Sequence, residues 1–390
     1  MWNPRDSFTL SLCSIRTLAP NLVHHIEDYV SEFVGQPENF SNLIISPQTS
    51  NKSHITNELS TTQKATIAKT AFELMGWDNF SEFVVFAGHG SQTTNNPYAS
   101  SLDCGACAGN KGRHNARILA NICNDSNVRE VLATEYGIAI PENTWFLAAE
   151  HNTTTNHICL FDGKLPDRFQ QQVEKLKDNL RVAQDYANVE QFNISDGKHK
   201  LEAGRRASDW AETRPEWGLA GNASFIIGPR YLTANLDLKT RSFLHSYDWK
   251  KDSDGKKLEA ILQGPMVVTQ WINNHYYFAS VDNEQFGSGT KVTQNITGKY
   301  GVVQGNGGDL KYGLPLESLR EDEHLLQHLP LRLTVLIHAP QKRVRSVITS
   351  NKETLEKLIE HKWIYLTVLD PEKENVVSFN QQSSIVSVVN

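Results

Sequence analysis

Apolar and polar positions alternate along the first half of this chain in a pattern that predicts helices and strands in turn. A helix is expected to start at Thr61-Thr62-Gln63, to turn an apolar face that includes Ala65, Ala68 and Phe72 toward a core, and to stop at Gly76. The same criteria predict strands at Phe83–Ala87, Thr144–Ala149 and His157–Phe161, and helices at Lys111–Cys123 and Val128–Tyr136.

Outside this stretch the pattern is less regular. Residues 21–33 have the apolar spacing of an amphipathic helix, and residues 47–63 form a polar connector rich in Ser, Thr and Asn. Apolar residues from Phe169 to Ala183 recur at intervals of four and three, which predicts a helix with one buried face. A polar break follows at residues 193–200, and beyond it short β-like stretches such as 260–268 and 331–338 stand out.

Strands that alternate with helices indicate an α/β fold with a mostly parallel sheet flanked by helices. We therefore divide the chain into a helical lead-in and polar connector (1–60), an α/β region (61–192), and an α+β carboxyl-terminal region (200–390).

Composition narrows the class of protein. With 39% hydrophobic and 21% charged residues over 390 positions, the chain has ample material for a folded core. A net charge of -6 without a basic cluster argues against a nucleic-acid partner. The longest apolar runs are too short to span a bilayer, and the first twenty residues lack the apolar core of a secretory signal. Five cysteines without framework spacing indicate a reducing compartment.

The run from Val84 to Gly112 carries the most specific chemistry. It places His89 between two glycines at the end of the first predicted strand, where open α/β sheets gather their ligands, and follows it with Cys104 and Cys107. Imidazole and thiolate are ligands of Zn²⁺. A single histidine at a strand end more often serves a backbone-capping role, so the zinc interpretation depends on the cysteines.

The same run, VVFAGHGSQTTNNPYASSLDCGACAGNKG, resembles the carboxyl-terminal zinc segment of the DabA family of inorganic carbon transporter subunits. Further similar segments follow in family order, namely RRASDWAETRPEWGLAGNASFI, LDLKTRSFLHSYDW, WINNHYYFASVDNEQFGSGTKVTQN and VVQGNGGDLKYGLPLESL. The resemblance extends from about residue 62 to about residue 372.

The resemblance implies a fold and a zinc site similar to those of β-carbonic anhydrase. His89 and Cys104 match the family's histidine and second cysteine, while Cys107 is a neighbour and not a ligand. The family's other two ligands lie in a Cys-x-Asp-x-Arg motif, and Cys13-Ser-Ile-Arg16 lacks the aspartate. We therefore expect this chain to be the carboxyl-terminal part of a split or truncated protein, inactive until another chain supplies that motif.

The resemblance also implies partners and a location. It suggests conversion of carbon dioxide to bicarbonate, coupled to a cation gradient through an antiporter-like membrane subunit called DabB. The chain would then be a peripheral protein on the cytoplasmic side of the bacterial inner membrane. The alternative is a non-catalytic fragment or interaction scaffold that keeps the fold without the chemistry.

Other patterns permit weaker interpretations. Gly88-His-Gly-Ser91 is similar to a lipase oxyanion turn, but no Gly-x-Ser-x-Gly accompanies it, and Cys104-Gly-Ala-Cys107 is similar to a redox dithiol. The glycine-rich turn that starts at Phe286 lacks the order of a phosphate loop. His151 is a possible partner of the metal ligands or a proton shuttle, whereas Glu150 is expected to be solvated at the surface. Charges and tryptophans between Arg205 and Trp217 fit either an ion-pair network or a docking surface.

Overall fold

The computed structural model describes residues 59–94, 110–163, 165–192, 199–209, 221–239, 241–290, 313–320, 331–373 and 375–380, with short segments at 294–296, 302–304, 325–326, 329 and 385–386. Two compact units make up the chain, and their main change-over falls between Trp210 and Ala211. The expected helix at 21–33 and most of the connector at 47–63 lie outside the described residues. No helix in the described ranges is both long enough and apolar enough to cross a lipid bilayer.

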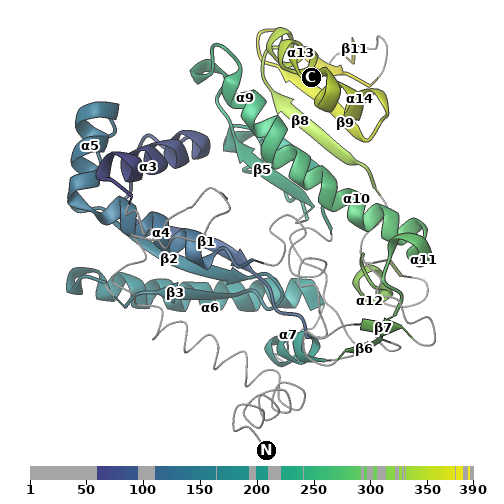
Figure 1. The fold of residues 1–390 in the computed structure, drawn as a ribbon, viewed down its shortest axis with the longest axis horizontal. Helices are drawn as coiled ribbons and strands as arrows, with labels where there is room; N and C mark the ends of the chain where they lie inside the picture. The colour runs from purple at the N-terminus through teal and green to yellow at the C-terminus, as the bar shows by residue number, and fades with distance from the viewer. Residues whose placement is uncertain are drawn as a thin grey trace, which may run out of the picture. The chain divides into compact units, whose positions relative to one another are not determined.

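The first unit is built on a three-stranded sheet of order β1-β2-β3 (Figure 1). Its elements are α3 (Thr61–Met75), β1 (Phe83–Gly90), α4 (Arg113–Asn124), α5 (Ser126–Tyr136), β2 (Trp145–Asn152), β3 (His157–Phe161), α6 (Gln170–Phe192) and α7 (His199–Ser208), with a 3-10 turn at Asp167–Phe169. The helices and strands predicted for this region are therefore confirmed. Their boundaries shift by up to three residues, except that α6 continues nine residues beyond the predicted end at Ala183. Helix α7 was not among the predicted helices.

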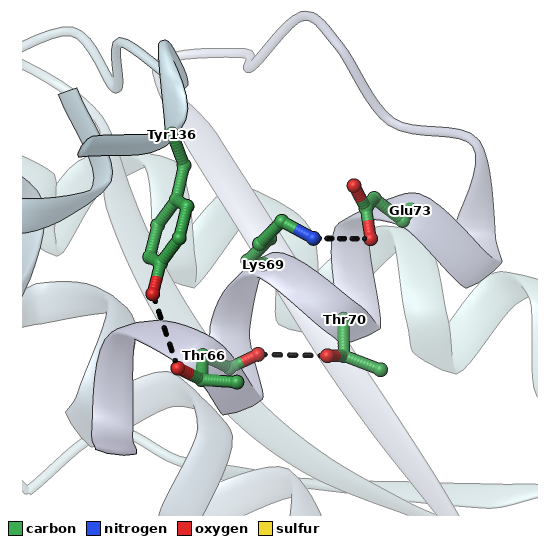
Figure 2. A network of polar contacts seen from close by, with 5 residues as sticks. All are labelled: Thr66, Lys69, Thr70, Glu73 and Tyr136. Atoms are coloured by element: carbon green, nitrogen blue, oxygen red, sulfur yellow. Dashed lines mark hydrogen bonds and ion pairs between the residues drawn. The ribbon is translucent and has the colours of Figure 1, made fainter. Parts of the chain in front are cut away.

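Helix α3 shows how local signals set these boundaries. Ser60 accepts a hydrogen bond from the backbone N–H of Gln63 at 3.2 Å, and the Gln63 side chain accepts one from the backbone N–H of Ser60 at 2.9 Å, which forms a capping box. Gly76 ends the helix in the left-handed region with a φ of 69°. Figure 2 shows the exposed side of α3, where the hydroxyl groups of Thr66 and Tyr136 lie 3.2 Å apart and join α3 to α5.

The orientation of β3 differs from the expected parallel arrangement. Strands β1 and β2 are parallel, but β3 pairs antiparallel with β2. The reason is the short connection, because residues 153–156 are too few for the crossover that a parallel strand requires. The sheet of this unit is therefore mixed.

Helices cover both faces of this sheet. On one face α6 packs over Leu147 and Ala149 of β2 and the partly buried Phe83 and Val85 of β1. On the other face the core formed with α3, α4 and α5 includes Phe86 and Phe146, whose rings stack at 5.4 Å between centroids. Side chains along β1 and β2 thus alternate between an α6 face and an α4 face.

The second unit contains a six-stranded sheet of order β11-β10-β9-β8-β4-β5, in which the four strands from β9 to β5 are parallel. Its strands are β4 (Ser224–Gly228), β5 (Ser242–Ser246), β8 (Leu333–His338), β9 (Ile364–Asp370), β10 (Asn375–Ser378) and β11 (Ile385–Val386), and β6 (Gln294–Ile296) pairs with β7 (Val302–Gln304). Its helices are α9 (Lys256–Ile261), α10 (Val267–Val281), α11 (Asn283–Phe286), α12 (Leu316–Leu319), α13 (Gln341–Ser350) and α14 (Lys357–Glu360). A single π-helical turn at Leu262–Met266 precedes α10, and another at Lys352–Glu356 precedes α14. Short 3-10 turns lie at Arg230–Leu232 and Trp249–Lys251.

One prediction in this unit is confirmed and one is wrong. The β-like stretch at 331–338 forms β8. The stretch at 260–268 is helical, because Ile261, Leu262 and Met266 bury their side chains against the sheet from consecutive helical turns. A short apolar run does not distinguish a buried helix from a buried strand.

Candidate functional site at the carboxyl ends of β1 and β2

Two histidines lie side by side at one edge of the first unit's sheet. In the parallel pairing of β1 with β2, His89 is opposite His151, with Gly88 opposite Glu150 and Gly90 opposite Asn152. Because the strands are parallel, both end at the same edge. The alternation that places Phe83, Val85, Leu147 and Ala149 on the α6 face places both imidazoles on that face too.

Glycines let the chain return directly onto His89. The backbone N–H of Gly112 donates to the carbonyl oxygen of His89 at 2.7 Å. A Cβ on Gly88 would lie 2.3 Å from the carbonyl carbon of Gly112, and a Cβ on Gly112 would lie 2.8 Å from the backbone nitrogen of His89. Only glycine fits at either position, so the start of α4 is held against the end of β1.

A buried ion pair occupies the opposite, α4 face of the same edge. Arg113, the first residue of α4, donates from Nη2 to Oε1 of Glu150 at 2.6 Å and from Nε to Oε2. The two side chains are only 6% and 7% exposed. A Cβ on Gly90 would lie 2.7 Å from Cδ and Oε1 of Glu150, so the carboxylate passes directly over that glycine.

The surface role expected for Glu150 is therefore wrong. A carboxylate in the apolar run of β2 is buried because Arg113 neutralises it across 37 positions of sequence. The sequence did contain a signal for this burial, because Glu150 lies inside a strand whose other residues are mostly apolar. A carboxylate in such a strand needs a buried cation beside it.

The segment after β2 is polar and buried, and sequence reasoning missed it. Thr153 and Thr154 are 9% and 1% exposed. The backbone N–H of Thr153 donates to the carbonyl oxygen of Gly90 at 2.8 Å, and the Thr154 hydroxyl accepts from the N–H of Gln92 at 3.1 Å. Five consecutive polar residues, from Asn152 at the end of β2 to Asn156, come directly after buried strand residues, and this run was the feature of the sequence that indicated a buried polar segment. The hydrogen bonds of Thr153 and Thr154 hold the residues that follow β2 against Gly90 and Gln92 at the end of β1.

The environment of His151 favours its neutral form. Burial lowers the pKa of His151, a hydrogen bond between Nε2 and Oδ1 of Asn156 (3.4 Å) opposes that shift, and the nearby charge of His89 adds to it. The effect of the His89 charge is consistent with the strand pairing, which places His151 beside His89.

The expected ligand Cys104 and its neighbour Cys107 lie outside the described residues. Within the described ranges, no three or more His, Cys, Asp or Glu side chains are grouped so as to hold a metal ion. An imidazole from His89 and a thiolate from Cys104 are suitable zinc donors, but zinc sites use three or four protein ligands. The two donors are therefore suitable for zinc, but they form a zinc site only together with at least one further protein ligand.

Cys123 and Asp125 have the spacing of the first two residues of the Cys-x-Asp-x-Arg motif, but their surroundings do not suit metal ligands. Burial raises the pKa of the Cys123 thiol to about 12, so it remains protonated. The carboxylate of Asp125 accepts from the backbone N–H of Asn127 at 2.9 Å and caps α5, and Asn127 stands where the motif requires arginine. These residues have structural roles.

Comparison with known proteins gives consistent matches over most of the chain. A family model described as "Probable inorganic carbon transporter subunit DabA" matches residues 7–364. Proteins of that name from Haloarcula marismortui and Natronomonas pharaonis are each 51% identical, over 92% and 94% of this chain and 45% of their own length. One from Bacillus subtilis is 46% identical over 80% of this chain and 36% of its own length. The chain spans less than half the length of these relatives.

Proposed function

This chain belongs to the DabA family, and from that membership we propose that it forms part of a transporter subunit for inorganic carbon. In this proposal His89 and Cys104 are two ligands of a zinc centre that converts carbon dioxide to bicarbonate. A Cys-x-Asp-x-Arg segment, which these 390 residues do not contain, supplies the remaining ligands. Bound zinc would lower the pKa of water and so prepare it to attack carbon dioxide.

The observation that carries the proposal is the contact between Gly112 and His89. The segment that contains Cys104 lies between Thr94 and Asn110 of the described structure, and Asn110 is two residues before that contact. Cys104 is eight positions before Gly112, whose backbone N–H donates to His89, so the intervening residues are long enough to let the thiolate reach the imidazole. This tether supports Cys104 as a ligand near the imidazole.

The remaining residues have defined supporting roles. The Arg113–Glu150 ion pair and the glycines Gly88 and Gly112 hold the end of β1 in place, which orients the His89 imidazole. His151 lies beside it without being a ligand. A membrane partner similar to DabB would couple the chemistry to a cation gradient and would hold the chain at the cytoplasmic face of the inner membrane.

The test is zinc content per chain, measured by atomic emission on the chain alone and on the chain purified together with a Cys-x-Asp-x-Arg polypeptide of the family. We expect near-stoichiometric zinc only in the combined sample, and its loss in His89→Ala and in Cys104→Ala. Cys107→Ala is the matched control and should retain the metal. Zinc absent from both samples would instead favour a scaffold without the chemistry, and equal loss in all three variants would refute the assignment of Cys107.

A further inference from the structure

A line of buried amide groups connects α6 to the His151 imidazole. It starts at the carbonyl oxygen of Thr155, which accepts from Nδ2 of Asn188 at 3.2 Å and from Nε2 of Gln184 at 3.0 Å. Nδ2 of Asn156 donates to Oδ1 of Asn188 at 2.9 Å, and Oδ1 of Asn156 faces Nε2 of His151 at 3.4 Å. These residues, namely His151, Thr155, Asn156, Gln184 and Asn188, all belong to the first unit.

The carbonyl at the start of this line fixes its direction. A carbonyl oxygen only accepts, so Asn188 must present its NH₂ group to Thr155 and its oxygen to Asn156. Asn156 must then present its own NH₂ group to Asn188 and its oxygen to His151. An oxygen in that place requires an N–H on the ring, which puts the proton on Nε2 and the lone pair of the neutral imidazole on Nδ1.

Burial keeps the line in this arrangement. Asn188 is fully buried and Asn156 is 7% exposed, so reversing either amide would place two donors or two acceptors face to face away from water. Asn156 also has a φ of 57°, a left-handed conformation that asparagine tolerates better than most residues. The turn that holds the amide is thus specific to a short side chain of this type.

We propose that Asn156 and Asn188 are positioning residues that hold His151 as an Nε2–H imidazole, with Nδ1 available as a hydrogen-bond acceptor beside His89. Its partner is a small hydrogen-bond donor at the shared edge of β1 and β2. The identification of that donor as the water that reacts with carbon dioxide rests on the proposed function. The tautomer itself does not depend on a bound metal.

The experiment is proton–nitrogen NMR on the full chain labelled with ¹⁵N-histidine, with the His151 signals identified by their loss in His151→Gln. The wild-type ring should show a proton on Nε2 that exchanges slowly with water. Asn188→Ala should speed that exchange roughly tenfold, the factor that the net contribution of one hydrogen bond allows, and should let the Nδ1–H form appear. Asn156→Gly should do the same, since glycine keeps the left-handed turn.

Gln184→Ala is the matched control, because it removes a donor to the same Thr155 carbonyl, one helical turn away, without touching the line to His151. It should leave the ring proton unchanged. A wild-type proton on Nδ1, or equal effects of Asn188→Ala and Gln184→Ala, would overturn the proposal. Zinc content measured on the same variants purified together with the Cys-x-Asp-x-Arg polypeptide separates the two ideas. A protected Nε2 proton in the chain but no zinc in the combined sample refutes only the proposed function, and zinc in the combined sample with a freely exchanging ring proton refutes only the positioning.

Discussion

The buried ion pair between Arg113 and Glu150 should be strongly coupled, and a double-mutant cycle measures that coupling. Arg113→Met alone leaves a buried carboxylate, and Glu150→Leu alone leaves a buried guanidinium. Each single change should cost about 3–5 kcal/mol, because an unpaired charge remains where its side chain is only 6–7% exposed. The double variant replaces both charges with apolar groups and should recover most of that loss.

The magnitude follows from the dielectric environment. Two unit charges about 4 Å apart attract by ~4 kcal/mol at an effective dielectric constant near 20, so the coupling energy should be about 3 kcal/mol or more. An exposed pair in the same unit provides the control. Lys69 and Glu73 lie 2.9 Å apart on α3 with side chains 32% and 50% exposed (Figure 2), and the same substitutions there should couple by only about 0.3–0.5 kcal/mol.

Hydrogen exchange measured by mass spectrometry in increasing urea is the suitable assay. A chain of two units does not have one unfolding free energy, whereas peptides from β2 and α4 report on the stability around the ion pair alone. A coupling energy below about 1 kcal/mol for Arg113 and Glu150, comparable with that of the α3 pair, would refute the reasoning that burial makes this interaction strong.

Three further changes test other parts of the structure. Gly90→Ala should destabilise β1 by about 1–3 kcal/mol, since its Cβ would meet the Glu150 carboxylate at 2.7 Å, while Gly204→Ala in the open part of α7 should stabilise by about 0.5–1 kcal/mol in the same exchange assay. Burial lowers the pKa of His275 on α10, so the unfolded chain binds a proton more readily than the folded chain, and the stability around α10 should fall as pH drops below about 6.5. His275→Gln should flatten that fall, measured on α10 peptides in the same exchange assay at several pH values. Because burial raises the pKa of Cys123 to about 12, iodoacetamide at pH 8 should modify it only after denaturation, and mass spectrometry of the native protein would contradict this by finding it alkylated.

The positions of His89 and His151 could be predicted from the sequence, because the signals for them are local. Glycines on either side of His89 marked the strand end, and the parallel run of β1 and β2 indeed brings His151 next to it. The site residues that went unpredicted, Arg113 and Asn188, depend on partners that lie 37 and 32 positions away. Such pairs leave no periodic trace in a single sequence.

The sequence by itself determined the elements whose limits depend on neighbouring residues. A capping box at Ser60 and a left-handed Gly76 bound α3, and strand-like runs gave β1 and β8, since capping and side-chain periodicity act within a few positions. Only the tertiary structure decided that residues 260–268 are helical and that Glu150 is buried. An apolar run can form either a buried helix or a buried strand, and a carboxylate can either be solvated at the surface or pair with a buried arginine. The packing of segments distant in sequence determines which of these states is lower in free energy.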